Sequence, residues 1–579
     1  MIEAVVGLGA LRARWRARLY WAALAAGGVA WAMPAGAQVS PVVPTPAELA
    51  PRAPVTTDGR ELPAVRTPPR RLAEPEQLEL DVTGYTVADD APAELRAALG
   101  RLTAPYVGPK KTYEDLVNAA DDVTRFLNRE LGLYLGYAYI PEQQPTDGRI
   151  RIEVLEGRLD QVILKWPSTP LPVSKEVIEG YLAALKPGAV LRVRDVERVV
   201  FLVNDLRGIL ARFDVQPGSQ PGTASLVVTP REDSSKSAKL DVDVNGSRFL
   251  GKERLGGLWA LNSPAGVGDA LTVNGLASAN GGLYFALAGY TRPVGSDGLK
   301  LGGSLSYIQY KLDATEFPLG VSGTAVNGTL YGLYPWVRAR NLNVFMLGAY
   351  NHTDFTDRRE VVGTTDRKQV DSLSVGATGD FRDDVLTGGV NSFEANLSGG
   401  QVKYPGTPPA GLDDAPNYRK LTLSFNRLQN VVTSRLLFYV AVRGQWAFDN
   451  LDTSEQFRLG GPDGIRAFSP GEGTGDSGWL ATTELRLLPP EEWLGRIARE
   501  SVVSLFFDAG GVTFRHDPSA RPSGFVNTAS FSGYGLAVSW VHGNDYALRL
   551  AIAKPRTGTP KADTLVRDPR LYAQFTKFF

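Results

Sequence analysis

The sequence predicts an all-β membrane protein, a sixteen-stranded transmembrane β-barrel over residues 237–579, preceded by two small α+β domains. Three observations predict the barrel: segments of alternating polarity fill this region, sixteen of them can be marked, and the chain ends on one whose last residue is Phe579. A barrel strand turns one side to lipid and the other to a wet lumen, so its side chains alternate. Bacterial single-chain barrels have an even number of strands.

The clearest of these segments covers residues 434–449. No run in this part of the chain reaches the 18 or more apolar residues of a membrane helix. A soluble β-sandwich would show the same alternation. The number of segments and the aromatic last residue of the final segment favour the barrel over the sandwich. The apolar side of this segment consists of Leu436, Phe438, Val440, Val442, Gly444, Trp446 and Phe448.

Length and composition narrow the class of protein. A chain of 579 residues is long enough for several domains. The 62 basic residues are balanced by 62 acidic ones, which argues against nucleic acid as a partner because no basic excess exists to displace counterions. Cysteine is absent, which excludes disulfides and thiolate metal sites.

The N-terminal part has the pattern of an exported protein. Residues 1–37 are predicted to be a signal peptide: arginines precede an apolar stretch at 19–33, and small residues at 35–37 form a cleavage site. Residues 38–77 are rich in proline, which fixes φ and removes backbone donors. This segment is predicted to be extended and semi-rigid.

Residues 78–164 and 165–234 are predicted to form the two α+β domains. In the first, a strand-like alternation at 78–82 precedes two segments of helical spacing and two further strands. The second repeats a similar order, with two helices before two strands. Each has the size of a small domain. The predicted helices span 91–101, 113–131, 174–184 and 193–206.

A loop between predicted strands that end near 449 and begin near 479 stands out by its length and its glycines. Loops this long without structure of their own are usually functional or disordered. Its glycines, including Gly460, Gly461 and Gly464, suit a backbone that must fold back on itself. The loop is therefore predicted to fold into the barrel lumen.

Two strands further on, an aspartate is predicted to face the lumen. Alternation places Leu505 and Phe507 toward lipid, and Phe506, Asp508 and Gly510 toward the interior. A carboxylate inside a barrel requires a cation or water. Arg466 of the long loop would supply a permanently charged, bidentate partner. The alternative is that Arg466 is a solvated loop charge and Asp508 faces water.

Several motifs resemble one known family. They are GLYLGYAYIPEQ at 132–143 and DGRIRIEVLEGR at 147–158, then VERVVFLVNDLRG at 196–208 and GTASL at 222–226. The first pair resembles the first POTRA domain, and the second pair the second POTRA domain, of TpsB-type two-partner secretion transporters, also called haemolysin secretion/activation proteins. The resemblance extends from about residue 78 to residue 579.

This resemblance implies an outer-membrane translocase. Its periplasmic POTRA domains would capture an unfolded partner protein, which would leave through the barrel. The implied partners are a secreted TpsA-like β-helical protein, such as an adhesin or a haemolysin, outer-membrane lipids and the barrel assembly machinery, for which Phe579 is the predicted signal. The family's plug helix and linker correspond to residues 38–77, and the proline content leaves open whether a helix plugs the pore.

The resemblance also covers the long loop. Residues 465–468 resemble the family's Val-Arg-Gly-Phe/Tyr loop tip, with departures at Ile465 and Ala467. Residues 506–510 resemble the strand motif Phe-x-Asp-x-Gly, which the arginine of that tip contacts. The resemblance implies a contact between loop and barrel that is formed by Arg466, Asp508, Ile465, Phe468, Gly461, Phe506 and Gly510.

Two other functions stay open at this stage: a factor that inserts other barrels into the membrane, and a diffusion porin. No enzyme activity, cofactor or metal site is predicted. Residues 475–478 (Gly-Asp-Ser-Gly) are similar to the nucleophile turn of serine proteases, but the chain has only 3 histidines and none stands in a matching context. The spacing of His352 and Asp354 is not that of a metal site.

Overall fold

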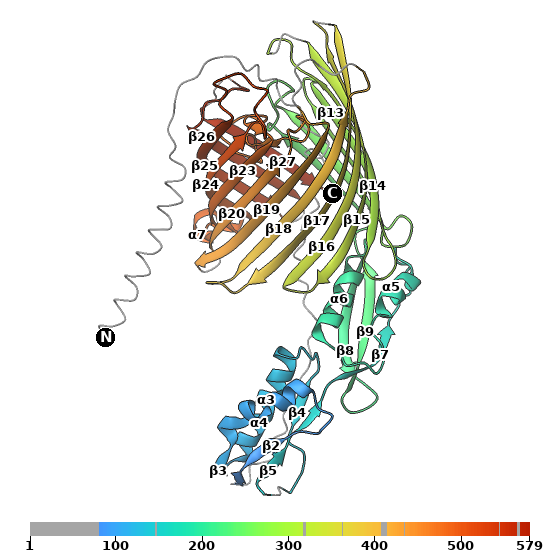
Figure 1. Cartoon of the computed structure of the whole chain (residues 1–579). Helices are drawn as coiled ribbons and strands as arrows, with labels where there is room; N and C mark the ends of the chain where they lie inside the picture. Colours follow the sequence, from blue (N-terminus) through green and yellow to red (C-terminus); the bar gives the residue numbers. More distant parts are fainter. Residues whose placement is uncertain are drawn as a thin grey trace, which may run out of the picture. The chain divides into compact units, whose positions relative to one another are not determined.

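The computed structural model of the chain describes residues 80–144, 147–316, 320–361, 363–406, 414–432, 435–542, 545–563 and 568–579 (Figure 1). The predicted signal peptide (1–37) and the proline-rich segment (38–77) lie outside the described residues. Within the described part of the chain, no helix has the length and apolar composition needed to span a membrane.

The predicted barrel of sixteen strands is confirmed. The strands form one closed sheet in chain order, in which each pairs antiparallel with the next and β27 returns to pair with β10. The strands are β10 (Lys236–Asp243), β11 (Arg254–Asn262), β12 (Ala270–Ser278), β13 (Leu283–Pro293), β14 (Lys300–Lys311), β15 (Val321–Arg338), β16 (Leu342–Arg359), β17 (Thr364–Asp383), β18 (Gly389–Lys403), β19 (Asn417–Val432), β20 (Leu436–Ala447), β23 (Ser477–Leu487), β24 (Ser501–Thr513), β25 (Thr528–His542), β26 (Tyr546–Thr557) and β27 (Arg570–Phe578).

The C-terminus closes this sheet. Lys239 on β10 is in register with Phe578 on β27. Beyond the strand, the backbone N–H of Phe579 donates to the carbonyl of Ala238 at 2.9 Å, and the N–H of Ala238 donates back at 3.3 Å. The Phe579 side chain is exposed. The last residue thus completes the ladder at the seam, and its use as an assembly signal stays a prediction.

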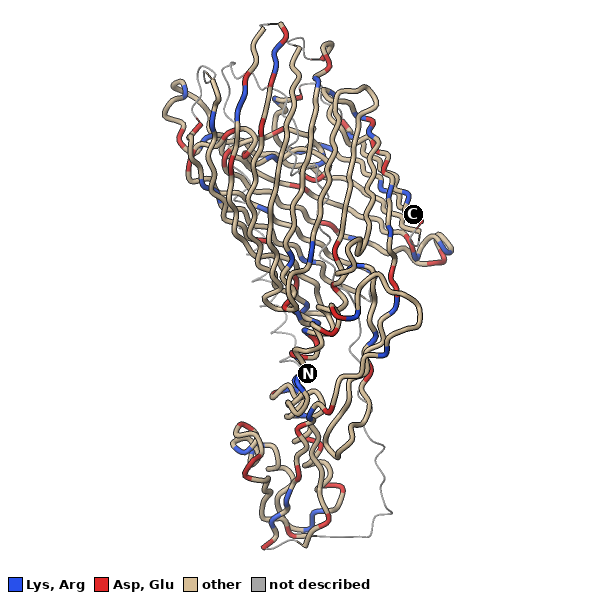
Figure 2. The backbone as a smooth tube through the Cα atoms, turned by 90° about the vertical axis from the view of Figure 1, so that its right-hand side faces the viewer, with Lys and Arg blue, Asp and Glu red and all other residues tan. Residues whose placement is uncertain are grey.

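The two faces of each strand differ as a membrane barrel requires. On β24, Leu505 is 55% exposed, whereas its neighbour Phe506 is 2% exposed. On β15, Leu330 is likewise exposed to the outside. Figure 2 shows the wall of strands as mostly uncharged. An exterior of large apolar side chains matches the lipid-facing band of an outer-membrane barrel.

Pro335 lies inside β15, where a proline cannot donate to the ladder. The register between β15 and β16 shifts between Pro335 and Val337. This irregularity accommodates the proline, so β15 continues to Arg338.

The first N-terminal domain packs two helices on short strand pairs. β1 pairs with β3, β2 with β5 in parallel, and β4 with β6. Helix α4 begins with a capping box. The side chain of Thr112 accepts a hydrogen bond from the backbone N–H of Asp115, and the side chain of Asp115 accepts one from the backbone N–H of Thr112. The elements are β1 (Leu80–Val82), β2 (Gly84–Thr86), α3 (Ala93–Thr103), η1 (Ala104–Tyr106), β3 (Gly108–Lys111), α4 (Tyr113–Arg129), β4 (Tyr137–Tyr139), β5 (Arg149–Arg151) and β6 (Glu153–Leu155).

The second domain begins earlier than predicted. Its sheet has the order β7-β9-β8, and β7 pairs in parallel with β9. Leu159 on β7 is buried in the same core as the two helices of this domain. The boundary predicted between 164 and 165 therefore needs correction, because β7 belongs to the second sheet. The elements are β7 (Arg158–Leu164), α5 (Lys175–Leu182), α6 (Val193–Asn204), β8 (Ile209–Pro217) and β9 (Thr223–Glu232).

The C-terminal end of α6 is bonded to the barrel. Asp205, the C-cap residue of α6, lies 2.7 Å from Nη2 of Arg338 at the end of β15. Lys300 at the start of β14 donates from Nζ to the backbone carbonyl of Asp205 at 3.1 Å. Cations are favourable beside the last carbonyls of a helix. These contacts fix the second domain at the ends of two barrel strands.

Candidate functional site

The loop between β20 and β23, residues 448–476, enters the barrel and is called here the inward-folded loop. It contains a short hairpin of β21 (Phe457–Arg458) and β22 (Thr474–Gly475). Its tip residues Ile465, Ala467 and Phe468 are buried together with Phe506 and other interior side chains of the wall. The tip therefore lies against the inside of the barrel.

The structure brings Arg466 of this tip to Asp508 on β24. Nη2 of Arg466 lies 2.8 Å from Oδ1 of Asp508, and Nε lies 2.9 Å from Oδ2. The backbone N–H of Arg466 also donates to Oδ2, at 3.1 Å. This is a bidentate pair with a third bond from the main chain. The Asp508 side chain is 0% exposed and that of Arg466 is 13% exposed, so the pair is shielded from water.

Two further wall residues contact the guanidinium group of Arg466. Nη1 of Arg466 lies 2.8 Å from Oε1 of Glu484 on β23. Its Cζ atom lies 3.4 Å from the centroid of the Phe506 ring, in cation–π geometry. We call Arg466, Glu484, Phe506 and Asp508 the tip cluster. Removing one partner from a buried ion pair costs roughly 3–5 kcal/mol because it leaves the other charge uncompensated, so we expect loss of either Arg466 or Asp508 to disturb the inward position of the loop strongly.

Glu484 was missed in the sequence analysis, although the alternation of its strand contains the signal. Trp479 and Leu485 on β23 are exposed on the outside, so even-numbered positions of this strand point inward. A second inward-facing residue, Arg486, donates from Nε to Oε2 of Glu484 at 2.8 Å. An interior carboxylate at this position could therefore have been predicted to face the loop.

Two predicted glycines have identifiable steric roles. Gly461 has φ of +120°, a conformation that disfavours other residues. A Cβ atom on Gly510 would lie 2.6 Å from Cδ2 of Leu459 and 2.7 Å from the carbonyl of Trp479. Gly510 thus leaves the space that the inward-folded loop occupies beside the wall.

Ala467 stands where the family has a glycine, and the structure explains why an alanine fits. Ala467 is not among the described residues with positive φ, so its Cβ atom causes no backbone strain. It is 5% exposed and packs over Gly533 on β25. A Cβ atom on Gly533 would lie only 2.4 Å from that of Ala467. The glycine on the wall therefore compensates for the alanine in the loop.

Phe468 anchors the far side of the tip. Its ring meets that of Phe531 edge to face, with centroids 5.0 Å apart and an interplanar angle of 73°. The hydroxyl of Tyr572 on β27 donates to the backbone carbonyl of Phe468 at 3.2 Å. The tip thus contacts the wall from β23 through β27.

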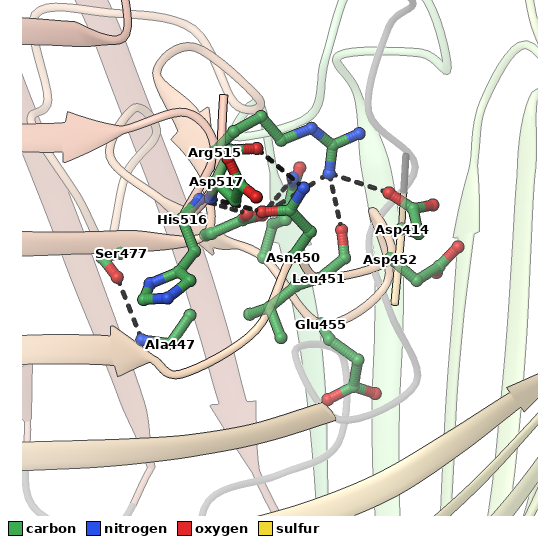
Figure 3. Close-up of polar contacts among 12 residues, drawn as sticks. Asp414, Ala447, Asn450, Leu451, Asp452, Glu455, Ser477, Arg515, His516 and Asp517 are labelled. Carbon is green, nitrogen blue, oxygen red and sulfur yellow. Dashed lines mark hydrogen bonds and ion pairs between the residues drawn. The ribbon is translucent and has the colours of Figure 1, made fainter. Parts of the chain in front are cut away.

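The base of the inward-folded loop is held differently, by neighbouring loops (Figure 3). Nη1 of Arg515 lies 2.8 Å from Oδ1 of Asp414 and donates to the carbonyl of Leu451 at 2.9 Å. Asn450 and Asp517 exchange two hydrogen bonds between side chain and backbone, at 2.9 and 2.7 Å.

Asp476, at the C-terminal end of the loop, completes this arrangement. Its carboxylate accepts from the N–H of His516 at 2.9 Å and from Nε2 of Gln456 at 2.7 Å. Its side chain is 0% exposed, and burial raises its pKa. We call Asp414, Asn450, Asp476, Arg515 and Asp517 the base cluster. It connects the inward-folded loop to the loops that follow β18 and β24.

Three more carboxylates of the loop have specific partners. Asp452 lies 2.6 Å from Nζ of Lys368 on β17, and Glu455 lies 2.8 Å from Nζ of Lys420 on β19. Glu472 accepts hydrogen bonds from the backbone N–H groups of residues 561–563, at 2.9 to 3.4 Å. Burial raises the pKa of Glu472. The loop is therefore bonded to the loop after β26 as well.

The similarity of residues 475–478 to a protease turn has a structural explanation. Ser477 is the first residue of β23, and its Oγ accepts a hydrogen bond from the backbone N–H of Ala447 at 2.9 Å. The serine therefore connects two strands of the wall. Within the described residues, no group of three or more His, Asp or Glu side chains is arranged to hold a metal ion.

Comparison with known families adds an independent finding. The family described as haemolysin secretion/activation protein ShlB/FhaC/HecB matches residues 222–532. A second family, the ShlB-type POTRA domain, matches residues 80–157, which agrees with a second domain that starts at β7.

Related proteins and structures agree with these matches. The heme/hemopexin transporter protein HuxB of Haemophilus influenzae (strain 86-028NP) is 24% identical over 463 residues, which are 79% of this chain and 80% of that protein. The outer membrane transporter CdiB of Escherichia coli O6:K15:H31 is 26% identical over 400 residues, 67% of this chain and 66% of that protein.

Among solved structures, CdiB from Escherichia coli matches with a TM-score of 0.68 at 19% identity, covering 90% of this chain and 95% of that chain. CdiB from Acinetobacter baumannii matches with a TM-score of 0.58 at 13% identity, covering 94% of this chain and 95% of that chain. At these identities the two structures support the fold.

Proposed function

Because the chain belongs to the ShlB/FhaC/HecB family of haemolysin secretion/activation proteins and is an outer-membrane transporter of the two-partner secretion type, we propose that the tip cluster controls passage of the partner. The inward-folded loop occupies lumen that an exported chain must cross. The loop has to shift while the partner passes, and the tip cluster returns it to the wall afterwards. The observation that carries this proposal is the buried pair of Arg466 and Asp508.

The N-terminal domains receive the partner in this proposal. Strand β8 is the edge of its sheet, and an edge strand can add an extended peptide through main-chain hydrogen bonds. The side chain of Asn204 already bonds the N–H and the carbonyl of Ala211 on that edge. The segment from Phe213 to Pro217 is therefore the proposed receiving edge.

A photo-crosslinking amino acid on this edge tests that role. We expect a crosslinker at Gln216 to capture the partner during secretion, because Gln216 is exposed near the end of β8. The matched control is Thr229, an exposed residue on the central strand β9. Equal capture at both positions, or capture only at Thr229, would contradict a specific edge.

The partner itself is proposed to be an extended secreted protein of the TpsA type that folds into a β-helix outside the cell, with an adhesin and a haemolysin as the first classes to consider. The relative HuxB is a heme/hemopexin transporter, which makes haem and hemopexin the first ligands to try on the partner. Mass spectrometry of the culture medium tests this. A large protein should vanish from the medium when the transporter is deleted and return on complementation.

The same deletion strain separates secretion from assembly of other barrels. A transporter of one partner leaves the other outer-membrane barrels at their normal amounts. A general loss of barrels from the outer membrane, with the partner reduced only in parallel, would support the assembly factor instead.

A further inference from the structure

The turn between β23 and β24, residues 488–500, is the most elaborate at its end of the barrel. It contains α7 (Glu491–Leu494) and the 3₁₀ helix η2 (Gly495–Glu500). The turn between β15 and β16, by comparison, covers only residues 339–341. Since neighbouring strands are antiparallel and β10 follows directly on the second N-terminal domain, this turn lies at the periplasmic end. Figure 1 shows α7 at the edge of the wall.

The end of this turn packs on the outside of the barrel. Ser501 on β24 is in register with Trp540 on β25, and both belong to the outward positions, like Leu505 and Leu536 further along the strands. Yet Ser501 is only 5% exposed. Helix η2 contacts both β24 and β25, and its residue Ala498 is 2% exposed. The turn therefore covers a patch of the outer wall.

Glu500 fixes the turn to an aromatic cluster on that wall. Its carboxylate accepts from Nε1 of Trp540 and bonds Nδ1 of His542, both at 2.9 Å. The Trp540 ring lies 5.5 Å from that of Tyr546, which lies 6.4 Å from that of Phe575. Outward aromatic rings near strand ends form the girdles that mark the boundary between lipid and water. The turn is thus held at the level of this boundary.

The other side of the turn exposes large apolar side chains. Trp493 is 68% exposed, Ile497 is 53% exposed and Leu494 is 48% exposed. Arg496 between them is exposed as well. The strand that follows the turn also exposes apolar side chains to the outside, since Leu505 on β24 is 55% exposed. An apolar patch of this kind in contact with water would be costly.

We propose that residues 491–497 are an anchor in the inner leaflet of the outer membrane, which binds phospholipid. Trp493, Leu494 and Ile497 enter the boundary between headgroups and acyl chains, and Arg496 bonds a headgroup phosphate. Because residues 491–500 contain three carboxylates and two guanidinium groups, apolar insertion outweighs attraction to anionic lipid. The anchor holds the hairpin of β23 and β24, which carries Glu484 and Asp508.

The absence of cysteine makes a direct test possible. The full chain with Trp493→Cys is labelled with the fluorophore NBD and reconstituted in vesicles of phosphatidylethanolamine and phosphatidylglycerol, with and without doxyl-labelled lipid. We expect blue-shifted emission and quenching by the doxyl lipid, similar to those of Leu505→Cys on the lipid-facing wall. Changing the fraction of phosphatidylglycerol should alter the quenching by less than twofold.

Ala520→Cys, in the exposed loop after β24 on the opposite side of the membrane, is the water-exposed control. The shift of each variant on unheated gels reports that its barrel is folded. Emission and quenching at position 493 equal to those at position 520 would overturn the proposal. A blue shift that appears only after the secreted partner is added would overturn it too, because it would mark a protein-docking surface.

Discussion

The two ends of the inward-folded loop are held by different parts of the molecule. At the tip, Arg466 binds carboxylates that stand on barrel strands. At the base, Asp476 and the carbonyl of Leu451 bind Arg515 of the loop after β24, and Arg515 in turn binds Asp414 of the loop after β18. The tip is thus bonded to strands of the wall, whereas the base is bonded to neighbouring loops as well as to Lys368 and Lys420 on β17 and β19. Breaking the tip should move the loop in the lumen, and breaking the base should loosen the extracellular side.

The largest effect is expected from Asp508→Ala. This change leaves Arg466 with Glu484 alone and removes a partner from a buried pair, at a cost of roughly 3–5 kcal/mol. The tip should leave the wall, which hydrogen exchange of residues 460–470 or single-channel conductance would detect. Thr482→Val is the matched control, because Thr482 donates to the same carboxylate at 3.0 Å but carries no charge. Unchanged exchange at the tip in Asp508→Ala would contradict the comparison.

The next effect is steric and can be reversed. Gly533→Ala places a Cβ atom 2.4 Å from that of Ala467, so the loop tip cannot pack against β25 unless one of the two backbones shifts. Ala467→Gly removes the opposing Cβ atom, so the double variant should again pack its loop tip against β25. A double-mutant cycle with tip exchange as the readout checks this. If Gly533→Ala alone has no effect, or if Ala467→Gly does not rescue it, the tip is not held against β25 as described.

Breaking the base cluster should have a smaller effect on the lumen. Arg515→Ala removes the bonds to Asp414 and to the carbonyl of Leu451. We expect faster proteolysis of the loops after β18 and β24 on whole cells, with exchange at the tip changed less than in Asp508→Ala. Arg521→Ala, in the same loop, serves as the control for charge. The reverse order, with the tip more affected than the loops, would remove the distinction between the two ends.

The smallest effect is expected from Glu472→Gln. Burial raises the pKa of Glu472, so its neutral form is favoured relative to an exposed glutamate. The amide is neutral and retains one oxygen for the N–H groups of residues 561–563. Proteolysis of the loop after β26 should stay within about twofold of the native protein, whereas Glu472→Ala should accelerate it because buried donors lose their partner. Equal rates for both variants would contradict this assignment.

The barrel was predictable because the same two-residue alternation recurs from strand to strand, with local irregularities such as the one at Pro335. The interior position of Asp508 follows from this alternation, and Glu484 could have been found in the same way. The base cluster could not, because Asp414 and Arg515 lie in loops without periodicity and come together only after the barrel closes. The start of the second domain at β7 was missed, since the strand pairing that assigns β7 to β9 is non-local.

The consequence of Ala467 also required the structure. In sequence, the alanine is a departure from the family's loop tip whose effect depends on its surroundings. Gly533, which makes room for it, is 66 positions away in the chain and is one of two glycines of β25, so no local pattern connects the two residues.

The amount of partner in the culture medium tests the central claim most directly. A strain that lacks the transporter is complemented with the native chain, Arg466→Ala or Asp508→Ala, and barrels in the outer membrane are quantified in parallel. The account predicts that both variants insert normally and secrete far less partner than the native chain. Native levels of secreted partner with both variants would show that the tip cluster has no part in transport.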